Sequence, residues 1–208
     1  MSRLRSPLRL ITMVTPHSVN IDGETIRTSR LVLRPWTLDD APAALTVFGD
    51  EAVTRWLSPA MAHVASAEEM AAVIASWLDS PPPAPAGRWA VTAASDGRVL
   101  GGVTVRPLPP ERSDLEIGWQ LDPTVWGQGY AAEAGHAVAH HAFEAGVEEL
   151  FAVVRPRNTR GARTAMSIGM EWVGETEKYY DLRLQVYRLR KGELDVPRLP
   201  GRTQAGRP

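Results

Sequence analysis

The sequence contains no cysteine, only two lysines and no long apolar run. Without cysteine the chain has no disulfide framework, no thiolate metal ligands and no cysteine nucleophile, which suits a reducing compartment. No stretch approaches the roughly 18 consecutive apolar residues that indicate a transmembrane helix. The opening segment, MSRLRSPLRLITMV, is not followed by a small-residue cleavage site for secretion. We therefore expect a soluble cytoplasmic protein that does not enter the membrane.

An excess of positive charge is also missing. Lysine and arginine total 23 against 24 aspartate and glutamate residues, which gives a formal net charge of -1 at pH 7. Binding to nucleic acid or to an anionic membrane rests on clustered excess lysine and arginine. The sequence therefore predicts neither a nucleic-acid partner nor a membrane partner, and it leaves the oligomeric state, a homodimer included, undecided.

The two ends of the chain differ from its body. Residues 1–23 and 195–208 are rich in proline, glycine and arginine and lack hydrophobic periodicity. Such composition is typical of flexible tails. The rest is long enough for one sizeable core, and the chain is 44% hydrophobic and 23% charged, as ordinary globular proteins are. We predict one domain over residues 24–194.

Hydrophobic periodicity divides this body into strands and helices. Alternating apolar residues predict strands, whereas apolar residues at helical spacing behind a Ser or Thr start signal predict helices. In chain order we expect a strand at 31–35, a helix after a capping box of Thr37 and Asp40, a helix from Ser66 to Leu78, hairpin strands at 88–94 and 98–107, a strand at 115–121, a helix from Gly129 to Gly146, a strand at 150–154, a helix from Asn158 to Ile168, and strands at 171–175 and 182–190.

One strand–helix–strand unit in this series decides the architecture. The strand at 115–121, the helix from Gly129 and the strand at 150–154 follow one another closely. Such a unit places its two strands parallel, with a right-handed crossover through the helix. The hairpin upstream is antiparallel. We therefore predict the α/β class with a mixed sheet.

The segment LEIGWQLDPTVWGQGYAAEA leads from that strand through a short loop into glycines that open the helix. The first N–H groups of a helix are unpaired and lie at the positive end of its dipole, so they bind phosphate well. Gly127 and Gly129 have no Cβ to block a pyrophosphate, and Ala131 and Ala132 keep the first turn slim. A tight turn with packing alanines is the simpler interpretation, but the strands on both sides of the helix weigh against it.

A dinucleotide-binding unit is the competing interpretation of the same glycines. Gly127, Gly129 and Ala132 satisfy its G-x-G-x-x-G/A spacing. That fingerprint normally follows its strand directly, whereas residues 122–126 intervene here, and too little chain remains for the second half of such a domain. An NADP-dependent oxidoreductase, with Arg155 at the 2′-phosphate, is kept as an alternative.

Four segments together carry a resemblance to a known family. LRPW (33–36), LEIGWQL (115–121), WGQGYAAEA (126–134) and NTRGARTAMSIGM (158–170) stand in the order and spacing of the GNAT superfamily of acyl-CoA N-acyltransferases, and the sequence resembles its RimJ/RimL-type branch. The resemblance implies a single GNAT domain with a central twisted, mostly antiparallel sheet flanked by helices, and a parallel strand pair splayed around the cofactor. It also implies acetyl-CoA or another acyl-CoA as co-substrate, an amine acceptor and no metal.

The resemblance also places the coenzyme. It implies that the strand backbone at Gln120 and Leu121 pairs with pantetheine, and Gly118 suits a β-bulge there. Trp126 stands where the superfamily often has Arg or Gln, so the phosphate contact is expected from the backbone alone. The amides that would hold the pyrophosphate are those of Gly127, Gln128, Gly129, Tyr130, Ala131 and Ala132.

Acylation of an amine requires a base within reach of the amine. Glu116 is our candidate because its side chain alternates away from apolar strand neighbours, and family members often place a carboxylate there; a solvated or ion-paired glutamate is the competing interpretation. By resemblance Asn158 contacts cofactor or substrate, and it also suits a helix N-cap. Arg163 faces a coenzyme phosphate or solvent. Met166 stands where many members carry a tyrosine general acid, which excludes that acid.

Three further groups complete the candidates. Trp36 and Trp56, with Trp77, are expected to line a substrate pocket, and core packing is the alternative. His136 and His140 lie one turn apart on one helix face, but no third ligand accompanies them, so we expect no metal site.

These observations together predict an enzyme that transfers an acetyl or related short acyl group to a primary amine by direct attack. The acceptor is left open between a protein N-terminal α-amine and a small-molecule amine. A non-catalytic acyl-CoA-binding regulatory module is kept as an alternative, because the family's tyrosine is replaced by Met166.

Overall fold

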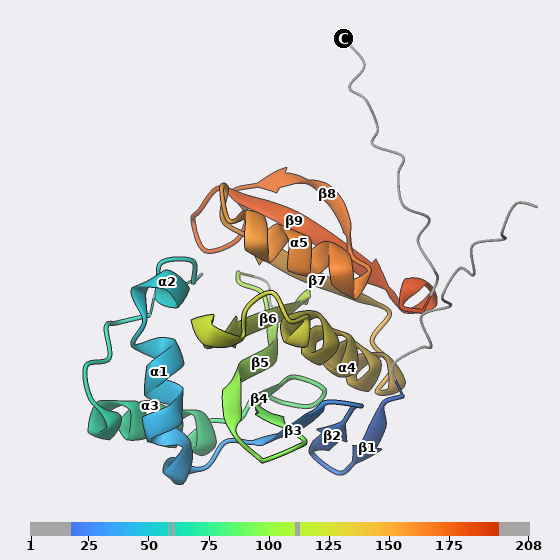
Figure 1. Ribbon diagram of the computed structural model, residues 1–208. Coiled ribbons are helices and arrows are strands. Elements are labelled where there is room, and N and C mark those ends of the chain that lie inside the picture. The colour runs from blue at the N-terminus through green and yellow to red at the C-terminus, as the bar shows by residue number, and fades with distance from the viewer. Residues whose placement is uncertain (1–17, 58, 60, 111–112, 196–208) are drawn as a thin grey trace, which may run out of the picture.

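The computed structural model describes residues 18–57, 59, 61–110 and 113–195. These residues form a nine-stranded sheet with helices on both faces, in the strand order β1-β2-β3-β4-β5-β6-β7-β9-β8 (Figure 1). The strands are β1 (Asn20–Asp22), β2 (Thr25–Arg27), β3 (Leu31–Pro35), β4 (Gly87–Ala93), β5 (Val99–Pro107), β6 (Leu115–Leu121), β7 (Glu149–Val154), β8 (Glu171–Thr176) and β9 (Leu184–Arg190).

Only one pair of neighbouring strands in this sheet is parallel. β6 and β7 run parallel, and the chain crosses between them through the helix α4 (Tyr130–Glu144). The other neighbours are antiparallel. The prediction of a mixed, mostly antiparallel sheet in one domain is confirmed.

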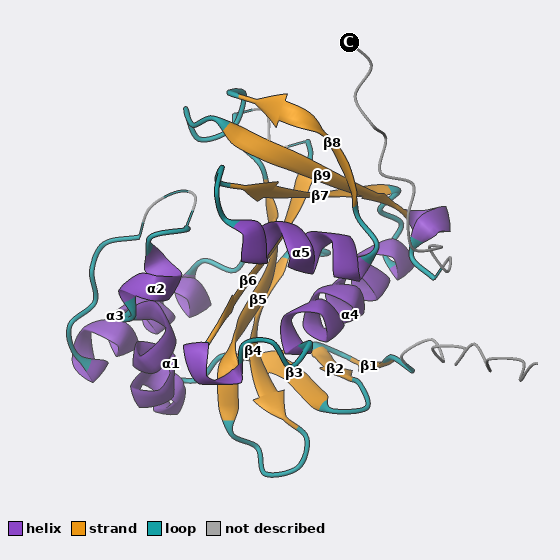
Figure 2. Cartoon of the chain, turned by 45° about the horizontal axis from the view of Figure 1, so that its top comes forward, coloured by secondary structure: helices purple, strands orange, loops and turns teal. Residues whose placement is uncertain are grey.

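The helices form two groups on opposite faces of the sheet (Figure 2). Trp89 and Val91 of β4 pack in the core that contains α4, whereas Ala90 between them packs in the core beneath α1 and α3. Successive strand residues point to opposite faces, so α4 covers one face and α1 and α3 the other. Besides α4, the helices are α1 (Ala41–Phe48), α2 (Glu51–Thr54), α3 (Ala67–Asp79) and α5 (Thr159–Ile168), with 3-10 turns η1 (Leu38–Asp40), η2 (Pro123–Val125) and η3 (Lys191–Glu193).

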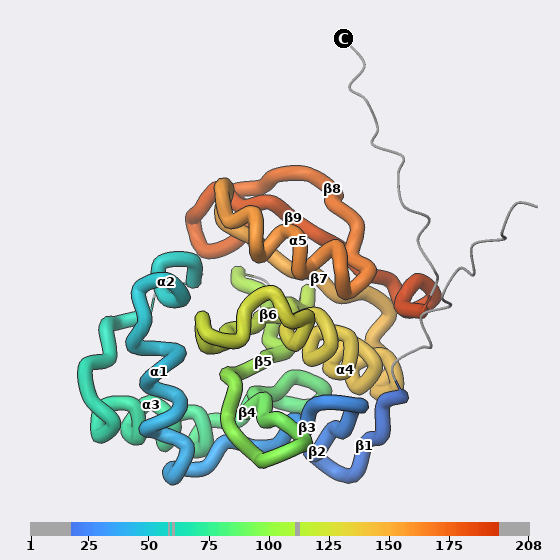
Figure 3. Tube along the Cα trace, viewed as in Figure 1, coloured from blue at the N-terminus to red at the C-terminus, as the bar shows by residue number. Residues whose placement is uncertain are grey.

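The tube in Figure 3 makes the separation of these groups visible, with α1, α2 and α3 gathered on one side of β4 to β6 and α4 on the other. None of the helices in the described residues is both long and apolar enough to span a bilayer.

Side-chain caps explain where the first helices begin. Oγ of Ser66 accepts a hydrogen bond of 3.1 Å from the backbone N–H of Glu69, which satisfies an unpaired donor in the first turn of α3. The Asp40 carboxylate accepts 2.9 Å from the backbone N–H of Thr37. The start signals read from the sequence are therefore confirmed at both places, although the turn after Thr37 is first 3-10 and becomes α-helical at Ala41.

Two expectations from the sequence are wrong. β1 lies inside the segment expected to be a tail and pairs with β2, so regular structure begins before residue 24. The β5–β6 register runs without a shift through Gly118, which excludes the bulge expected there. Crowding across the strands explains this glycine instead, because a Cβ on Gly118 would stand 3.0 Å from Oγ1 of Thr104 on β5.

Candidate active site

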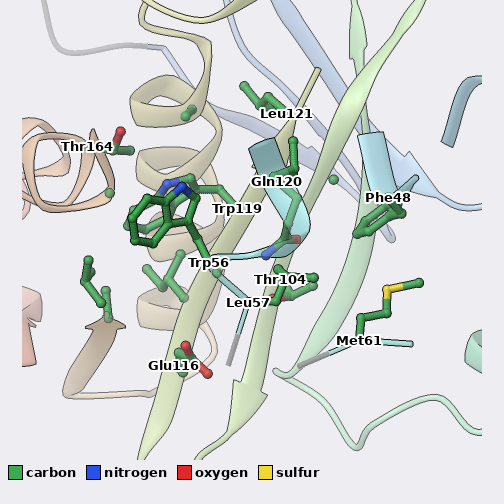
Figure 4. A pocket seen from close by; sticks show the side chains of 18 of the residues that line it. Phe48, Trp56, Leu57, Met61, Thr104, Glu116, Trp119, Gln120, Leu121 and Thr164 are labelled. Atoms are coloured by element: carbon green, nitrogen blue, oxygen red, sulfur yellow. The ribbon is translucent and has the colours of Figure 1, made fainter. Parts of the chain in front are cut away.

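A cavity of about 360 Å³ opens where β6 and β7 separate. The two strands are paired at a single position, Glu116 with Phe151, and then diverge, as the resemblance implied (Figure 2). Figure 4 shows Glu116 and Thr104 around the same space as the side chains of Trp56 and Met61. The cavity therefore begins at the point where the parallel ladder ends.

The cavity has two ends, which differ in their walls. The strand-split end lies between β6, β7 and the start of α5, and is lined by Trp119, Gln120, Leu121, Val154, Asn158 and Thr164. The aromatic end lies over the sheet face beneath α1 to α3, and is lined by Trp36, Phe48, Trp56, Trp77, Arg88 and Thr104. Glu116 lines the same cavity, at the one position where β6 pairs with β7.

At the strand-split end, the backbone of β6 beyond Glu116 has no β7 partner in the described ladder. Gln120 and Leu121 line the cavity there, as expected for residues that would pair with pantetheine. The indole of Trp126 donates a hydrogen bond of 2.8 Å to the Leu121 carbonyl, which fixes the loop between β6 and α4. The pairing of a ligand with Gln120 and Leu121 stays a prediction.

The start of α4 presents a run of unused donors. Among the described residues, none of the backbone N–H groups from Gly127 to Ala132 donates a hydrogen bond to the protein. Gly127 and Gly129 have φ values of 79° and 80°, a left-handed conformation that only glycine adopts at little cost. A Cβ on Gly127 would meet no atom within 4 Å, so open space lies beside it. The helix start thus offers unpaired N–H groups with room for an anion.

Glu133, in the first turn of α4, connects the helix start to the loop before β3. Its carboxylate accepts hydrogen bonds of 2.6 Å from the Thr28 hydroxyl and 2.6 Å from Nε of Arg30. Arg30 also donates 3.0 Å to the carbonyl oxygen of Gln128. Burial alone would raise the pKa of Glu133, but the bonds from Thr28 and Arg30 outweigh it and lower the pKa. Glu133 is therefore a structural carboxylate that ties the loop before β3 to the helix start.

Glu116 is the buried carboxylate of the cavity, with 4% of its surface exposed. Arg106 donates 3.0 Å from Nε to its Oε2, and the phenol of Tyr180 donates 2.8 Å to the same oxygen. No described residue donates to Oε1, so that oxygen is available to a ligand. Burial raises the pKa of Glu116, and the opposing effects of Arg106 and Tyr180 do not cancel it. The solvated glutamate considered from the sequence is wrong, while an ion-paired carboxylate with a raised pKa is what the structure contains.

The start of α5 contributes Asn158, whose Oδ1 accepts 2.9 Å from the backbone N–H of Gly161. Asn158 caps the helix and lines the cavity, so both expectations for it are compatible. Arg160 lines the cavity as well, with its guanidinium carbon 3.5 Å from the ring centroid of Trp126. Arg163 is exposed and does not line the cavity. The arginine that contacts Trp126 is therefore Arg160, and the expectation that the backbone alone contacts the phosphate stays a prediction.

The aromatic end is built from side chains that pack edge to face. The ring of Trp36 lies 5.8 Å from that of Trp77, and Phe48 lies 5.4 Å from Trp77. Trp56, in the turn after α2, lines the same cavity. Trp36 and Trp56 line the cavity as expected, and Trp36 at the same time belongs to the core beneath α1 and α3.

A comparison with family models gives a match over residues 30–171 to a domain described as the acetyltransferase (GNAT) domain. That match covers more than half of the chain and contains the whole cavity-forming region from β3 to α5. This chain belongs to the GNAT acetyltransferase family. It is accordingly an acyl-CoA-dependent acyltransferase, with acyl-CoA as its co-substrate.

Relatives and solved structures agree with the GNAT assignment. The chain is 26% identical over 155 residues to the uncharacterized N-acetyltransferase YoaA of Bacillus subtilis, a match that covers 74% of this chain and 86% of YoaA. A GNAT-family acetyltransferase from Bacillus anthracis shares the fold with a TM-score of 0.68 at 22% identity, over 81% of this chain and 99% of that one. RimJ of Mycobacterium smegmatis does so with a TM-score of 0.67 at 18% identity, over 80% and 84%.

The fold excludes the alternative of an NADP-dependent oxidoreductase with a dinucleotide-binding unit. A dinucleotide-binding unit requires a doubly wound, mostly parallel sheet, whereas the GNAT sheet contains one parallel pair among the described strands. Arg155, the residue considered for a 2′-phosphate, instead donates 2.8 Å to the carbonyl of Leu57. It ties β7 to the loop after α2.

The two histidines of α4 do have a third neighbour. Asp195, which follows η3, places Oδ1 2.9 Å from Nε2 of His136 and Oδ2 3.3 Å from Nε2 of His140. The three offer ligand atoms within 4.8 Å of one another. The expectation that no third ligand accompanies the histidines is therefore wrong. None of the three lines the cavity, so the cluster is separate from this GNAT site.

Four residues in or beside the cavity were not predicted from the sequence: Arg88, Arg106, Arg160 and Tyr180. A usable signal existed for Arg106, because the hairpin register sets it beside Glu116 on β6. Tyr180 lies in the turn before β9 with φ 59°, and nothing in its local sequence indicates that it reaches Glu116. Arg160 stands three residues from Arg163, and only the rotation of α5 decides which of the two faces the cavity.

Proposed function

We propose that this GNAT protein transfers an acetyl or related short acyl group from acyl-CoA to a primary amine by direct attack. The observation that carries the proposal is Glu116, a buried carboxylate that lines the cavity where β6 and β7 separate. Its raised pKa makes it a better proton acceptor than an exposed glutamate.

The coenzyme is assigned to the strand-split end. The unpaired N–H groups from Gly127 to Ala132 bind its pyrophosphate, and Arg160 adds a positive charge beside Trp126. Pantetheine then runs along the unpaired backbone of β6 toward Glu116. RimJ of Mycobacterium smegmatis, which shares the fold, was solved in complex with CoA-disulfide, and this supports a coenzyme in the corresponding groove.

The amine enters from the aromatic end and attacks the thioester. Its nitrogen forms a bond to the carbonyl carbon, the carbon–sulfur bond breaks, and coenzyme A leaves as a thiolate. Glu116 accepts the proton that the amine loses, at Oε1 or through a water molecule. A thiol pKa near 8.5 lets the thiolate leave with little help, which agrees with the absence of a tyrosine at Met166.

The demand on Glu116 depends on the amine. Deprotonating a lysine-like amine with a pKa of about 10.4 costs roughly 4.6 kcal/mol at pH 7, whereas an α-amine near 7.8 costs only about 1 kcal/mol. A single carboxylate is a much weaker base than a lysine-like amine. This favours an acceptor whose amine is readily deprotonated.

The experiment is a product screen. The purified protein is incubated with several acyl-CoAs and a panel of amines that includes amino acids, peptides, polyamines and aminoglycosides. We expect an acylated amine by mass spectrometry together with an equal amount of free coenzyme A thiol. Thermal stabilisation by acetyl-CoA with no product from any amine contradicts the proposal and favours the non-catalytic acyl-CoA-binding module.

A further inference from the structure

The aromatic end of the cavity contains a guanidinium that lacks an anionic partner. Arg88 on β4 lines this end, and its Nε is buried without a hydrogen-bond partner. In the described part of the chain, its one attractive contact is with the face of Trp77, 5.7 Å from the guanidinium carbon to the ring centroid. Burial and the nearby charge of Arg106 both lower the pKa of Arg88. The guanidinium therefore has a buried donor without an acceptor and a charge without a counter-charge, and a bound anion would satisfy both.

The sheet register sets the position of Arg88 relative to Glu116. Arg88 pairs with Thr104, and Thr104 pairs with Gly118, two residues from Glu116 on β6. Directly opposed residues and alternate residues of a strand share one face, so the two side chains lie on the same face. Two strand spacings and two residues correspond to a Cα–Cα separation of about 12 Å. Both residues line the cavity on that face, so one small molecule in the cavity can contact the charged ends of both.

The charges at the aromatic end of the cavity indicate which kind of acceptor can bind there. The charge of Arg106 is balanced by Glu116, with which it is ion-paired. Among the described residues that line the aromatic end, Arg88 therefore contributes one unbalanced positive charge. Polyamines and aminoglycosides carry several positive charges and are disfavoured there. A monoanion matches the single unpaired guanidinium, and a carboxylate fits its planar fork. The aromatic walls suit an apolar portion of the same molecule.

We propose that Arg88 binds a carboxylate of the acceptor, which makes the acceptor a small primary amine that carries a carboxylate and an apolar portion. This inference rests on the proposed function, because it uses the same cavity and places the amine at Glu116. The acceptor is thus held at two points, with its carboxylate on β4 and its amine on β6.

The test compares acceptors that share an apolar group and differ in the carboxylate, with each kcat/KM expressed per neutral amine because the carboxylate also changes the pKa of the amine. Phenylalanine, phenylalaninamide and phenethylamine form one set, and leucine, leucinamide and 3-methylbutylamine form a second. We expect the amino acid of each set to have the highest kcat/KM, at least about tenfold above its neutralised partners, the size of one charge-assisted contact. In Arg88→Gln this preference falls at least about tenfold, while the KM for acyl-CoA stays as in the wild type.

Arg98→Gln is the control, because it removes the same charge from the turn between β4 and β5 at an exposed position outside the cavity. It should keep the wild-type preference. A loss in Arg88→Gln that is equal for all members of a set indicates a merely structural arginine and overturns the inference.

The two proposals fail in different ways. Wild-type acylation of decarboxylated amines or peptide N-termini that equals or exceeds acylation of the amino acids overturns the carboxylate subsite and leaves the proposed function intact. Absence of any acylated amine overturns the proposed function itself.

Discussion

The phenol of Tyr180 donates a hydrogen bond of 2.8 Å to Oε2 of Glu116, although 64 residues separate them in the chain. Arg106 donates to the same oxygen at 3.0 Å. Both partners stabilise the ionised carboxylate, and because both donate to Oε2, no described residue donates to Oε1. Burial and the charge of Glu116 raise the pKa of Tyr180 well above its usual range, so the phenol stays protonated and remains a donor. Tyr180 is thus a positioning residue for the proposed base.

Replacing Tyr180 with phenylalanine removes a hydrogen bond that favours the charged form of Glu116. The pKa of Glu116, which burial already raises, therefore rises further. Because only the ionised carboxylate accepts a proton, the acid limb of the kcat/KM profile should move to higher pH. We expect activity to fall roughly tenfold at neutral pH and to recover at alkaline pH. A uniform loss at all pH values would show that Tyr180 affects packing and not the base.

Glu116→Gln removes the base while keeping the shape of the side chain. Turnover should fall by roughly 10² to 10⁴ with an unchanged KM for acyl-CoA, and the acid limb should disappear. Glu175→Gln is a matched control, because Glu175 on β8 is also ion-paired, with Arg183, and lies outside the cavity. An unchanged turnover rate of Glu116→Gln at neutral pH would show that Glu116 is not the general base.

Gly127→Leu should weaken acyl-CoA binding. The side chain fills the open space beside the unpaired N–H groups, so we expect the KM for acyl-CoA to rise at least about tenfold, the loss of one or two charge-assisted bonds. Gly146→Leu is the control for backbone strain. Gly146 also has a positive φ, 93°, and open space beside it, but it lies at the other end of α4. Equal kinetic effects of the two substitutions would argue against a pyrophosphate site at Gly127.

Arg160→Ala and Arg163→Ala test the rotation of α5. Arg160 lines the cavity above Trp126, whereas Arg163 is exposed outside it. We expect the KM for acyl-CoA to rise roughly tenfold in Arg160→Ala and to stay within about twofold of wild type in Arg163→Ala, because only one of them loses a charge-assisted phosphate contact. Steady-state kinetics at low salt measures both. A larger rise in the KM for acyl-CoA in Arg163→Ala than in Arg160→Ala would instead support Arg163 as the phosphate contact, as the sequence suggested.

Local signals in the sequence predicted the longer elements and their order, whereas the short elements β1, β2 and α2 were not expected. Ser66 and Glu69 indicated the start of α3, and the glycines before Tyr130 indicated the start of α4, since caps and positive φ angles leave marks within a few residues. The parallel pair followed from the strand–helix–strand order. Features of this kind depend on residues that are close in the sequence, so they can be predicted from it.

The composition of the active site was predicted less well, because it depends on long-range placement. Glu116 was identified from strand alternation, but its partner Tyr180 comes from a turn that no local pattern connects to β6. Arg160 and Arg163 have the same residue type three positions apart, and only the packing of α5 distinguishes them. Asp195 lay beyond the predicted domain, yet it contacts both histidines of α4.

A crystal structure of the protein with coenzyme A bound tests the central claim most directly. The account predicts the pyrophosphate within hydrogen-bond distance of the backbone N–H groups from Gly127 to Ala132, and the thiol beside Glu116 between β6 and β7. A coenzyme whose phosphates lie away from the start of α4, or whose thiol ends far from Glu116, would contradict it.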